Sequence, residues 1–435
     1  MQKRTPRHVI ISFTGNSLTH FGGIYLLQSF FKQLKLRKQL RHYLQFIQRN
    51  NRYTIAEEIF AIVYPISLGL GRIETSHLLK HNGVFQYLTG LPTYPNPTTL
   101  RRFLLRMAPL ALPKLRNFHD RLLLSMILKP EPPTRVIFDL DSTVLILYGK
   151  QEMARIGYNP KKWGRPSYHP LLCFNGITKD FWHGELRPGD THTATGTVEL
   201  LKASFAKLPP SVKIVIIRAD KGFYDHETVE YLETNKALFV IVAKLTGPVK
   251  RRISTLSYQV HSSGLETAEF IYQPTRWKKE YRFIVVRRPI PEDPTEQLTL
   301  FSMGKYSYQV LVTNMKLTPL HTWRFYNGRA AVELIIKELK GDYPLGKIPT
   351  KHFAANQVYF HTLLFSYNLI NWFKRLCLPT EFQNMTLRSL RTRLLLIPSE
   401  LIKSGGNRKI LKLPANFLYK DALQYAIKKI EKFNP

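Results

Sequence analysis

Two carboxylates lie two residues apart inside an apolar stretch near the middle of the chain. They are Asp139 and Asp141, within Arg135 to Leu147, a segment otherwise rich in Val, Ile, Leu and Phe. Such a segment predicts a buried strand, in which residues two apart project from the same face. Because an unpaired carboxylate is costly to bury, the pattern predicts that these side chains are paired or bind a metal ion.

A further carboxylate follows a second apolar run. Val212 to Ile217 predicts another buried strand, and Asp220 comes just after it. In α/β proteins, sites form at the carboxyl edge of the parallel strands. Two carboxylates there, with one more from a helix, would suit hard cations such as magnesium, which prefer oxygen ligands. Two such ions about 3.5–4 Å apart can activate the attacking oxygen and stabilise the leaving one in phosphoryl transfer.

A helix predicted from Tyr326 to Lys340 carries the third candidate, Glu333. Tyr326, Arg329 and Glu333 are three and four residues apart, so they share one helical face. Lys340 lies two turns beyond Glu333 on the same face. The stripe could hold a metal ion at the carboxylate and DNA phosphates at the cations. By spacing alone, a salt-bridged surface stripe is the simpler interpretation.

Three motifs together are similar to those of one enzyme family. The spacing Y-x2-R-x3-E-x6-K, from Tyr326 to Lys340, resembles at every fixed position the signature of bacterial insertion-sequence DDE transposases. Asp141-Ser142-Thr143 resembles the family's first block, a strand Asp followed by Ser or Thr. The segment Arg218 to Phe223 resembles its second block, where a strand-end Asp precedes a Gly-aromatic pair. The resemblance covers most of the chain, roughly from Val9 onward.

The resemblance implies a ribonuclease H-like catalytic core: an α/β fold with a mixed sheet flanked by helices. It implies Asp141, Asp220 and Glu333 as the catalytic residues and as ligands of magnesium, for which manganese can substitute. The family's Asp directly precedes the hydroxyl pair, which favours Asp141 over Asp139 as the first ligand. Asp139 lies on the same strand face and could assist without touching the metal.

The same resemblance implies what the enzyme does with DNA. Tyr326, Arg329 and Lys340 would hold the cleaved end. The reaction would be magnesium-dependent cleavage and strand transfer, the cut-and-paste transposition of an insertion sequence, by a homodimer that pairs two element ends. Trp277 and Trp323 could each stack on a flipped base. The alternative for an isolated tryptophan is packing, which is more common.

The charge of the chain also points to nucleic acid. Lys and Arg total 64 against 30 Asp and Glu, a formal net charge of +34. No acid precedes Glu57, whereas that stretch has ten Lys and Arg, and the tail from Phe382 has eleven against three acids. Both ends are therefore predicted to contact the phosphates of double-stranded DNA. A membrane-surface protein can be equally basic, and a solvated face is the simpler alternative.

Few features indicate a membrane, a zinc site or an oxidising compartment. The uncharged stretch from Val9 to Phe31 is broken by polar residues and glycines, so it does not predict a membrane span. Cys173 and Cys377 have apolar neighbours and no histidines at zinc-ligand spacing. His169, His183 and His192 match no metal motif. These features predict an intracellular protein with no membrane partner. The resemblance to insertion-sequence transposases implies a cytoplasmic, nucleoid-associated bacterial protein.

The elements that must position the carboxylates divide the chain into five predicted regions. We expect a helical DNA-binding region at 1–125, a first part of the catalytic core at 130–250, a β-rich insertion at 251–318, a second part of the core at 319–380, and a basic C-terminal region at 381–435. In the first region, a turn at Pro95 to Thr98 leads into a helix with Arg101 and Arg102. This suits a helix-turn-helix reader of the major groove, although any small helical domain can contain such a corner.

The alternating pattern of strands and helices predicts a partly parallel sheet. The expected strands are 171–177, 181–186, 239–242, 281–287 and 306–313, and the expected helices are 195–208, 225–235 and 353–376. Two rival functions share this outline: a nuclease that only hydrolyses DNA, and a DNA-binding protein whose site has decayed. The presence of all three carboxylates argues against decay.

Overall fold

The computed structural model describes residues 13, 15–46, 52–159, 162–261, 264–290, 301–303, 305–406 and 408–435. They divide into two compact units. Unit 1 comprises the described residues within Met1–Arg41, Arg49–Leu100 and Phe373–Asn434, and unit 2 comprises those within His42–Gln48 and Arg101–Trp372. Four of the ten basic residues before Glu57 lie outside the described part of the chain: Lys3, Arg4, Arg7 and Arg49.

Unit 1 is mainly helical and combines both ends of the chain. Its helices are α1 (Ile24–Gln33), α2 (Leu36–Tyr43), α3 (Ile55–Leu68), α4 (Gly83–Thr89), α12 (Thr380–Gln383), α13 (Leu387–Leu390) and α14 (Lys420–Lys432), with a 3-10 segment at Ile73–His81 and a π-helical turn at Arg391–Leu395. A small sheet joins β1 (Leu18–Thr19), β14 (Ser399–Ser404) and β15 (Arg408–Lys412). The structure thus unites segments that the sequence predicted as two separate regions.

Local sequence explains the best-defined helix of unit 1. Thr54 accepts the backbone N–H of Glu57, and the Glu57 carboxylate accepts that of Thr54, which completes a capping box at the start of α3. The helix ends at Gly69, whose φ of 79° suits glycine. Among the described residues of the predicted all-helical N-terminal region, β1 is a strand. Its partner, β14, is distant in sequence, so local periodicity carries no trace of the pairing.

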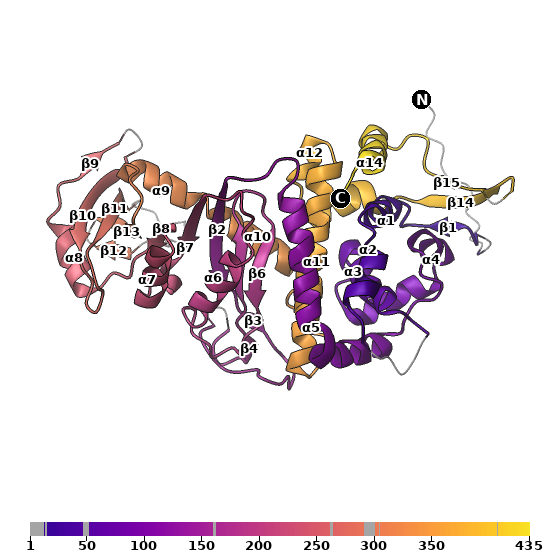
Figure 1. Ribbon diagram of the computed structural model, residues 1–435, viewed down its shortest axis with the longest axis horizontal. Helices are drawn as coiled ribbons and strands as arrows, with labels where there is room; N and C mark the ends of the chain where they lie inside the picture. Colours follow the sequence, from indigo (N-terminus) through magenta and orange to yellow (C-terminus); the bar gives the residue numbers. More distant parts are fainter. Residues whose placement is uncertain are drawn as a thin grey trace, which may run out of the picture. The chain divides into compact units, whose positions relative to one another are not determined.

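Unit 2 is built on one large sheet with the strand order β6-β5-β2-β7-β8-β13-β11-β10-β9, and β12 pairs with β13 (Figure 1). The strands are β2 (Arg135–Ser142), β5 (Leu171–Asn175), β6 (Phe181–Glu185), β7 (Ile214–Ala219), β8 (Leu238–Val242), β9 (Gln259–Val260), β10 (Glu266–Tyr272), β11 (Tyr281–Pro289), β12 (Phe301–Met303) and β13 (Tyr306–Thr313). A separate short ladder joins β3 (Leu145–Ile146) to β4 (Ser167–Tyr168). β7 pairs in parallel with β2 and β8, and the other pairs are antiparallel. The predicted α/β class with a mixed sheet is confirmed.

The predicted β-rich insertion is antiparallel, as expected, but it is not a separate layer. Strands β9 to β13 extend the main sheet, because β13 pairs with β8 through residues 311–313 and 240–242. The shorter helices are α6 (Thr197–Phe205), α7 (His226–Thr234), α8 (Gly247–Ser254), α9 (Pro319–Asn327) and α10 (Ala330–Gly341). Two long helices also belong largely to unit 2: α5 (Pro97–Ile127) from Arg101 onward, and α11 (Phe353–Cys377) as far as Trp372.

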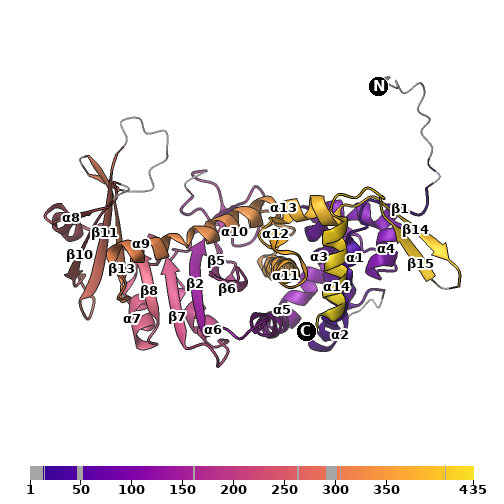
Figure 2. The ribbon, with the colours of Figure 1, turned by 90° about the horizontal axis from the view of Figure 1, so that it is seen from above.

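Strand alternation gives the centre of the sheet two distinct faces. On one face of β2, Phe138 packs against Trp182 and against Phe205 of α6. On the other face, Ile137 belongs to a core that includes Tyr326 of α9. Asp139 and Asp141 continue the face of Ile137, because side chains two apart in a strand point the same way. The two strand carboxylates therefore lie on the side of the sheet that α9 and α10 cross (Figure 2).

Among the helices that the structure describes, none combines the length and the apolar character needed to span a membrane.

Candidate active site

The sheet register brings Asp141 and Asp220 to the same edge. β2 and β7 are parallel, and Leu140 of β2 pairs with Ala219 of β7. Asp141 directly follows Leu140, and Asp220 directly follows Ala219. Neighbouring strands lie about 4.8 Å apart, which places the two residues side by side. Asp141 accepts the backbone N–H of Ser142 at 2.8 Å, and Asp220 accepts that of Gly222 at 2.8 Å. A backbone N–H one or two residues further along the chain thus orients each carboxylate.

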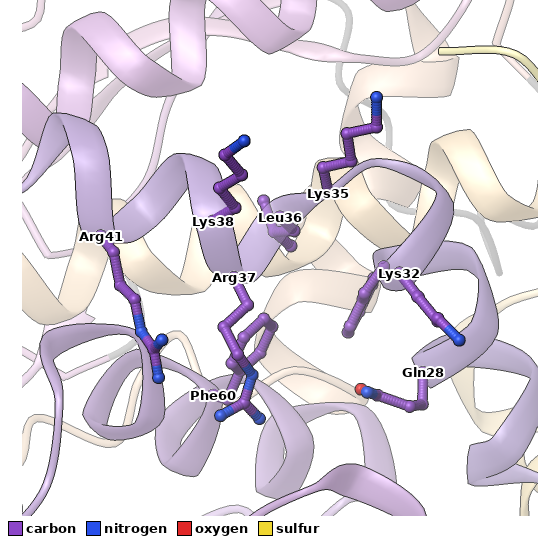
Figure 3. A pocket seen from close by; sticks show the side chains of 9 residues that line it. Gln28, Lys32, Lys35, Leu36, Arg37, Lys38, Arg41 and Phe60 are labelled. Carbon is purple, nitrogen blue, oxygen red and sulfur yellow. The ribbon is translucent and has the colours of Figure 1, made fainter.

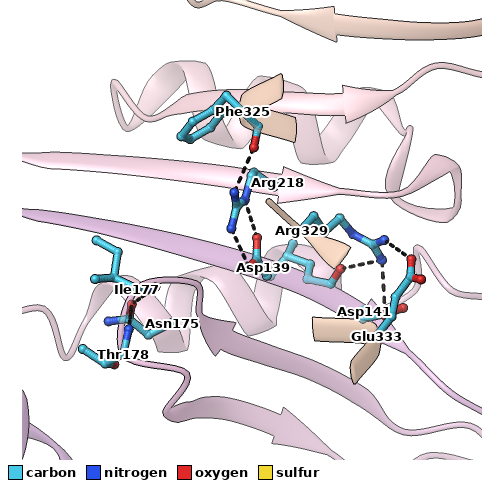
Figure 4. A network of polar contacts seen from close by, with 10 residues as sticks. Asp139, Asp141, Asn175, Ile177, Thr178, Arg218, Phe325, Arg329 and Glu333 are labelled. Atoms are coloured by element: carbon cyan, nitrogen blue, oxygen red, sulfur yellow. Dashed lines mark hydrogen bonds and ion pairs between the residues drawn. The ribbon is translucent and has the colours of Figure 1, made fainter. Parts of the chain in front are cut away.

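Arg329 connects Asp141 with Glu333, the third predicted carboxylate. Its Nη2 lies 3.2 Å from Asp141 Oδ2, and its Nη1 lies 3.1 Å from Glu333 Oε1 (Figure 4). The Arg329 side chain is only 5% exposed, whereas that of Glu333 is 66% exposed. Arg329 is therefore a buried cation that faces two of the three acids, and Glu333 is the acid that solvent reaches most easily.

Burial and neighbouring charges shift the pKa values of Asp141 and Arg329. Burial raises the pKa of Asp141 to about 6, Arg329 opposes the rise, and the negative charges of Asp220 and Glu333 add to it. Burial lowers the pKa of Arg329, but Asp141 and the other nearby acidic groups outweigh this, and the pKa ends above its ordinary value. The other two carboxylates thus repel the Asp141 carboxylate, and Arg329 offsets that repulsion.

The donor set suits a hard cation, but the arrangement is not a finished metal cage. Three carboxylates are the oxygen ligands that magnesium and manganese prefer. Among the described residues, however, no group of three His, Cys, Asp or Glu side chains is arranged to hold a metal ion. In this arrangement the cation that joins Asp141 to Glu333 is Arg329. Binding a metal ion would require these side chains to rearrange.

A second ion pair lies behind the first, on the same strand face. Asp139 and Arg218 are register partners on β2 and β7. Arg218 Nε lies 2.6 Å from Asp139 Oδ1, and Nη2 lies 2.8 Å from Oδ2, so both carboxylate oxygens are used. Both side chains are almost fully buried, at 6% and 1% exposed. Asp139 is therefore committed to Arg218.

Arg218 also reaches the helix that carries the third carboxylate. Its Nη1 donates to the carbonyl of Phe325 at 2.9 Å, and its guanidinium lies 5.2 Å from the Phe325 ring centroid (Figure 4). A Cβ on Gly328 would lie 2.3 Å from Arg218 Nη1, and one on Gly176 would lie 2.6 Å from Arg218 Nη2. Only glycine leaves the guanidinium this space. Sequence reasoning missed Arg218, although it precedes Asp220 by two residues just as Asp139 precedes Asp141.

The whole sequence, residues 1–435, matches the family described as transposase DDE domain group 1. The chain belongs to this family. It is a DNA transposase of the DDE type, an enzyme class that uses divalent metal ions. A solved structure to which the chain is similar is the piggyBac transposase synaptic complex with hairpin DNA, at 13% sequence identity and a TM-score of 0.42, over 93% of this chain and 90% of that one. The sequence has no significant match among curated proteins.

The signature of the transposase spans two helices rather than one. α9 ends at Asn327 and α10 begins at Ala330. At the junction, the N–H of Arg329 donates to the Tyr326 carbonyl at 2.8 Å, a three-residue spacing that tightens the turn. Lys340, near the end of α10, donates to the Val144 carbonyl at 3.0 Å, just beyond the Asp141-Ser142-Thr143 motif. The single helix predicted from Tyr326 to Lys340 is therefore interrupted at Gly328.

Three of the predicted DNA-contacting side chains pack within the transposase itself. Tyr326 is 7% exposed and belongs to the core beneath the sheet. The ring of Trp277 is buried beside Tyr224 and Tyr281, with centroids 5.0 and 5.2 Å away. Trp323 is half-buried and donates to Gln309 Oε1 at 3.0 Å. For both tryptophans this geometry favours the packing alternative.

The two predicted arginines at the start of α5 have different surroundings. Arg101 Nε donates to the Pro349 carbonyl at 2.9 Å, so part of its hydrogen-bonding capacity is used within unit 2. Arg102 is exposed. The helix that carries them is 31 residues long, far longer than the short stretch predicted as a recognition helix.

A histidine, His169, contacts the Asp141-Ser142-Thr143 motif. His169 Nε2 lies 3.1 Å from Ser142 Oγ, and its Nδ1 lies 2.8 Å from the Thr191 carbonyl. Burial lowers the pKa of His169, which keeps the ring neutral, so Nδ1 carries the proton and Nε2 accepts from Ser142. Spacing along the chain had set this residue aside. The contact between His169 and Ser142 joins residues 27 positions apart, so spacing along the chain does not predict it.

Proposed function

We propose that this transposase cuts and rejoins DNA in a magnesium-dependent reaction with Asp141, Asp220 and Glu333 as the metal ligands. Two observations support the proposal: Arg329 contacts both Asp141 and Glu333, and Asp220 directly follows β7, the parallel neighbour of the strand that carries Asp141. We favour Asp141 over Asp139 as the first ligand, because both oxygens of the buried Asp139 carboxylate already accept hydrogen bonds from Arg218. Asp141 lies two residues further along β2, at the carboxyl end of the strand.

Bound magnesium would activate the attacking oxygen and stabilise the leaving one. Before a metal ion binds, Arg329 supplies the positive charge between two of the carboxylates. Arg329 offsets the repulsion between Asp141 and Glu333 until their charges are needed as ligands. Once released, its guanidinium has the planar fork that binds phosphate oxygens. Lys340, two turns along α10, would contact the same DNA end.

The proposed reaction has two phosphoryl transfers on double-stranded DNA. In the first, water attacks the phosphorus at the element's end, forming a new P–O bond while the bond to the 3′ oxygen breaks and that oxygen takes a proton. In the second, the freed 3′-hydroxyl attacks another phosphodiester: a new P–O bond forms, the attacked phosphorus loses its former 3′ oxygen, and that oxygen takes the proton of the hydroxyl. The attacked phosphodiester is in target DNA; if a hairpin forms first, it is on the opposite strand, and water must hydrolyse the hairpin to free the 3′-hydroxyl again before it attacks target DNA. Two ends must be processed together, so we propose a homodimer.

Arg218 and Asp139 act in this scheme as positioning residues. Their bidentate pair ties β2 to β7, and the bond to the Phe325 carbonyl ties both strands to the end of α9. Because Arg329 follows four residues after Phe325, a shift of this carbonyl would move Arg329 and Glu333 relative to Asp141. The pair therefore sets the distance between the strand carboxylates and the helix carboxylate.

The decisive experiment uses DNA that flanks the gene. If the enzyme mobilises an insertion sequence, inverted repeats should bound the gene, and a labelled duplex that ends in such a repeat is the substrate. With magnesium, the purified protein should nick this duplex and then join its 3′ end to a second duplex. Hydrolysis without joining would indicate a nuclease, and failure of both steps on cognate ends would contradict the proposal.

A further inference from the structure

A cleft of about 500 Å³ lies in unit 1, at the corner between α1 and α2 (Figure 3). Five of its nine lining residues are cations and none is acidic. The lining residues are Gln28, Phe31, Lys32, Lys35, Leu36, Arg37, Lys38, Arg41 and Phe60. A concentration of one sign of charge in a cleft produces a stronger field than the same charges spread over a flat surface.

Four of the five cations are exposed, and their side chains have no hydrogen-bond or ion-pair partner among the described residues: Lys32, Lys35, Lys38 and Arg41. They recur at every third position, so they follow the chain around the corner. In Figure 3, Lys35 and Lys38 extend to one side, while Lys32 and Arg41 extend to the other. Like charges at this spacing repel one another, and a bound anion would offset that repulsion.

The fifth cation has a different task. Arg37 Nη1 lies 3.2 Å from Glu57 Oε1, and Nη2 donates to the carbonyls of Thr89 and Gly90 at 3.2 and 3.0 Å. Arg37 thus fastens α2 to the start of α3 and the end of α4. The corner that carries the other cations is held in place by Arg37, whose own charge is already partnered.

Lys35 sits at the turn itself with a φ of 50°, in the left-handed region. Its N–H donates to the Lys32 carbonyl at 2.9 Å, and its carbonyl accepts the N–H of Gln39 at 3.0 Å. Glycine or asparagine usually occupies such a position, because a Cβ is crowded there. A glycine at this position would therefore relieve the crowding while it removes the charge of Lys35.

We propose that this cleft binds the sugar–phosphate backbone of duplex DNA, independently of base sequence and outside the catalytic unit. The proposal rests on the proposed function, which supplies the DNA. Phe31 and Phe60 line the floor, but each is only 2% exposed and they stack on each other with centroids 5.8 Å apart. The cleft therefore offers no ring face to an unpaired base. What it offers is cationic side chains, which bind phosphates.

The sharpest test exploits the backbone of Lys35. Lys35→Gly removes one charge while giving the turn the residue that its φ favours, so the variant should fold. Lys236→Gly is the matched control, because Lys236 is also exposed and left-handed, with a φ of 54°, and lies in unit 2. Binding of the full chain to a duplex of arbitrary sequence is measured by fluorescence anisotropy over a series of salt concentrations.

For Lys35→Gly, the slope of log K against log salt should become shallower by about 0.9, the value for one lost phosphate contact. The slope for Lys236→Gly should match that of the wild type. Changing Lys32, Lys35, Lys38 and Arg41 together to Gln should reduce the slope by roughly 2 to 4, since each contact contributes about 0.9. The same four-charge loss at Lys202, Lys213, Lys236 and Lys316, all exposed in unit 2, should leave it nearly unchanged.

The outcomes separate the inference from the function on which it rests. Wild-type protein that does not bind DNA would contradict the proposed function. Wild-type binding with equal losses in the cleft variant and the unit 2 variant would overturn the cleft, because net charge alone would then explain the effect. A cleft variant that loses only single-stranded DNA would overturn it as well, since the site would then bind unpaired strands.

Discussion

The cations of the two units are used in opposite ways. In the unit 1 cleft, Lys32, Lys35 and Lys38 are exposed and without partners among the described residues. In unit 2, Arg218 and Arg329 are buried and held by carboxylates at 2.6 to 3.2 Å. Salt screens exposed charges much more than buried pairs. The first group is therefore suited to binding a polyanion, and the second to fixing the positions of catalytic groups.

This comparison separates two properties that a single basic composition conceals. A charge that is already satisfied inside the protein adds little to the attraction of DNA, whereas an unpaired surface charge adds little to the geometry of a site. Variants in unit 1 should therefore change affinity and its salt dependence, while variants at the sheet edge should change rate or stability. The following predictions test that separation, beginning with the largest expected effect.

Replacing Glu333 with Gln should lower DNA cleavage by at least about a hundredfold, the scale of losing one electrostatic stabiliser in an active site. The substitution keeps the shape of the side chain but removes a full negative charge that hard cations need. DNA affinity should be unchanged or slightly higher, because one repulsive charge toward phosphate is gone. Cleavage rate in magnesium and binding by anisotropy are measured on the same protein.

Glu199→Gln is the matched control, because Glu199 is an exposed acid on α6 in the same unit. It should cleave at the wild-type rate. Normal cleavage by the Glu333→Gln protein would remove Glu333 from the site. Thermal melting of both variants is recorded as well, because inactivity of an unfolded Glu333→Gln protein would not support a role for Glu333 in the site.

Replacing Arg218 with Gln should destabilise the protein by about 3–5 kcal/mol, because the buried Asp139 carboxylate would lose its cation. Asp139→Asn in the same background should restore most of this free energy of unfolding, since the uncompensated charge disappears. Urea denaturation measures both. The double variant should still cleave at least about tenfold more slowly than wild type, because the bond to the Phe325 carbonyl that positions Arg329 is missing. Wild-type cleavage by the double variant would show that the pair is only structural.

Much of the site was visible in sequence because it rests on short-range patterns. Strand alternation predicted that Asp139 and Asp141 share a face, and the apolar run before Asp220 predicted the parallel neighbour of that strand; β2 and β7 confirm both strands. The expected strand at 306–313 is β13, residue for residue. Each of these features depends on residues within a few positions of one another.

The features that sequence did not reveal depend on contacts across the fold. Arg329 bridges two carboxylates that belong to different elements, and Arg218 meets the Phe325 carbonyl far along the chain. The break between α9 and α10 lies at the same place, where a Cβ on Gly328 would clash with the Arg218 guanidinium. Periodicity along a helix reports which residues share a face and is silent about what packs against it.

Replacing Asp141 with Asn should stabilise the metal-free protein at neutral pH. Burial raises the pKa of Asp141 to about 6 from an ordinary 3.8, so the folded state holds the proton more tightly than the unfolded state. Stability is therefore lost as the pH rises from 3.8 to 6, and the cost is constant above that range. Removing the acid should increase the free energy of unfolding by about 1–3 kcal/mol above pH 6 and have no effect below pH 4. Denaturation in the presence of a chelator at pH 8 and pH 3.5 checks both limits.

The smallest effect is expected at Lys340, and it separates binding from positioning within one helix. Lys340 is exposed and donates to the Val144 carbonyl at 3.0 Å, so Lys340→Gln should change stability by less than about 1 kcal/mol. If Lys340 contacts the DNA end as proposed, the substrate concentration for half-maximal cleavage should rise several-fold, with little change in the maximal rate, because the lost contact is made before and during the reaction alike.

The matched control is Lys337→Gln, which removes the same charge from an exposed lysine one turn earlier on α10 and should leave both quantities near wild type. Equal effects of the two substitutions would mean that only the net charge of the helix matters, and Lys340 would then join the general basic surface instead of the site.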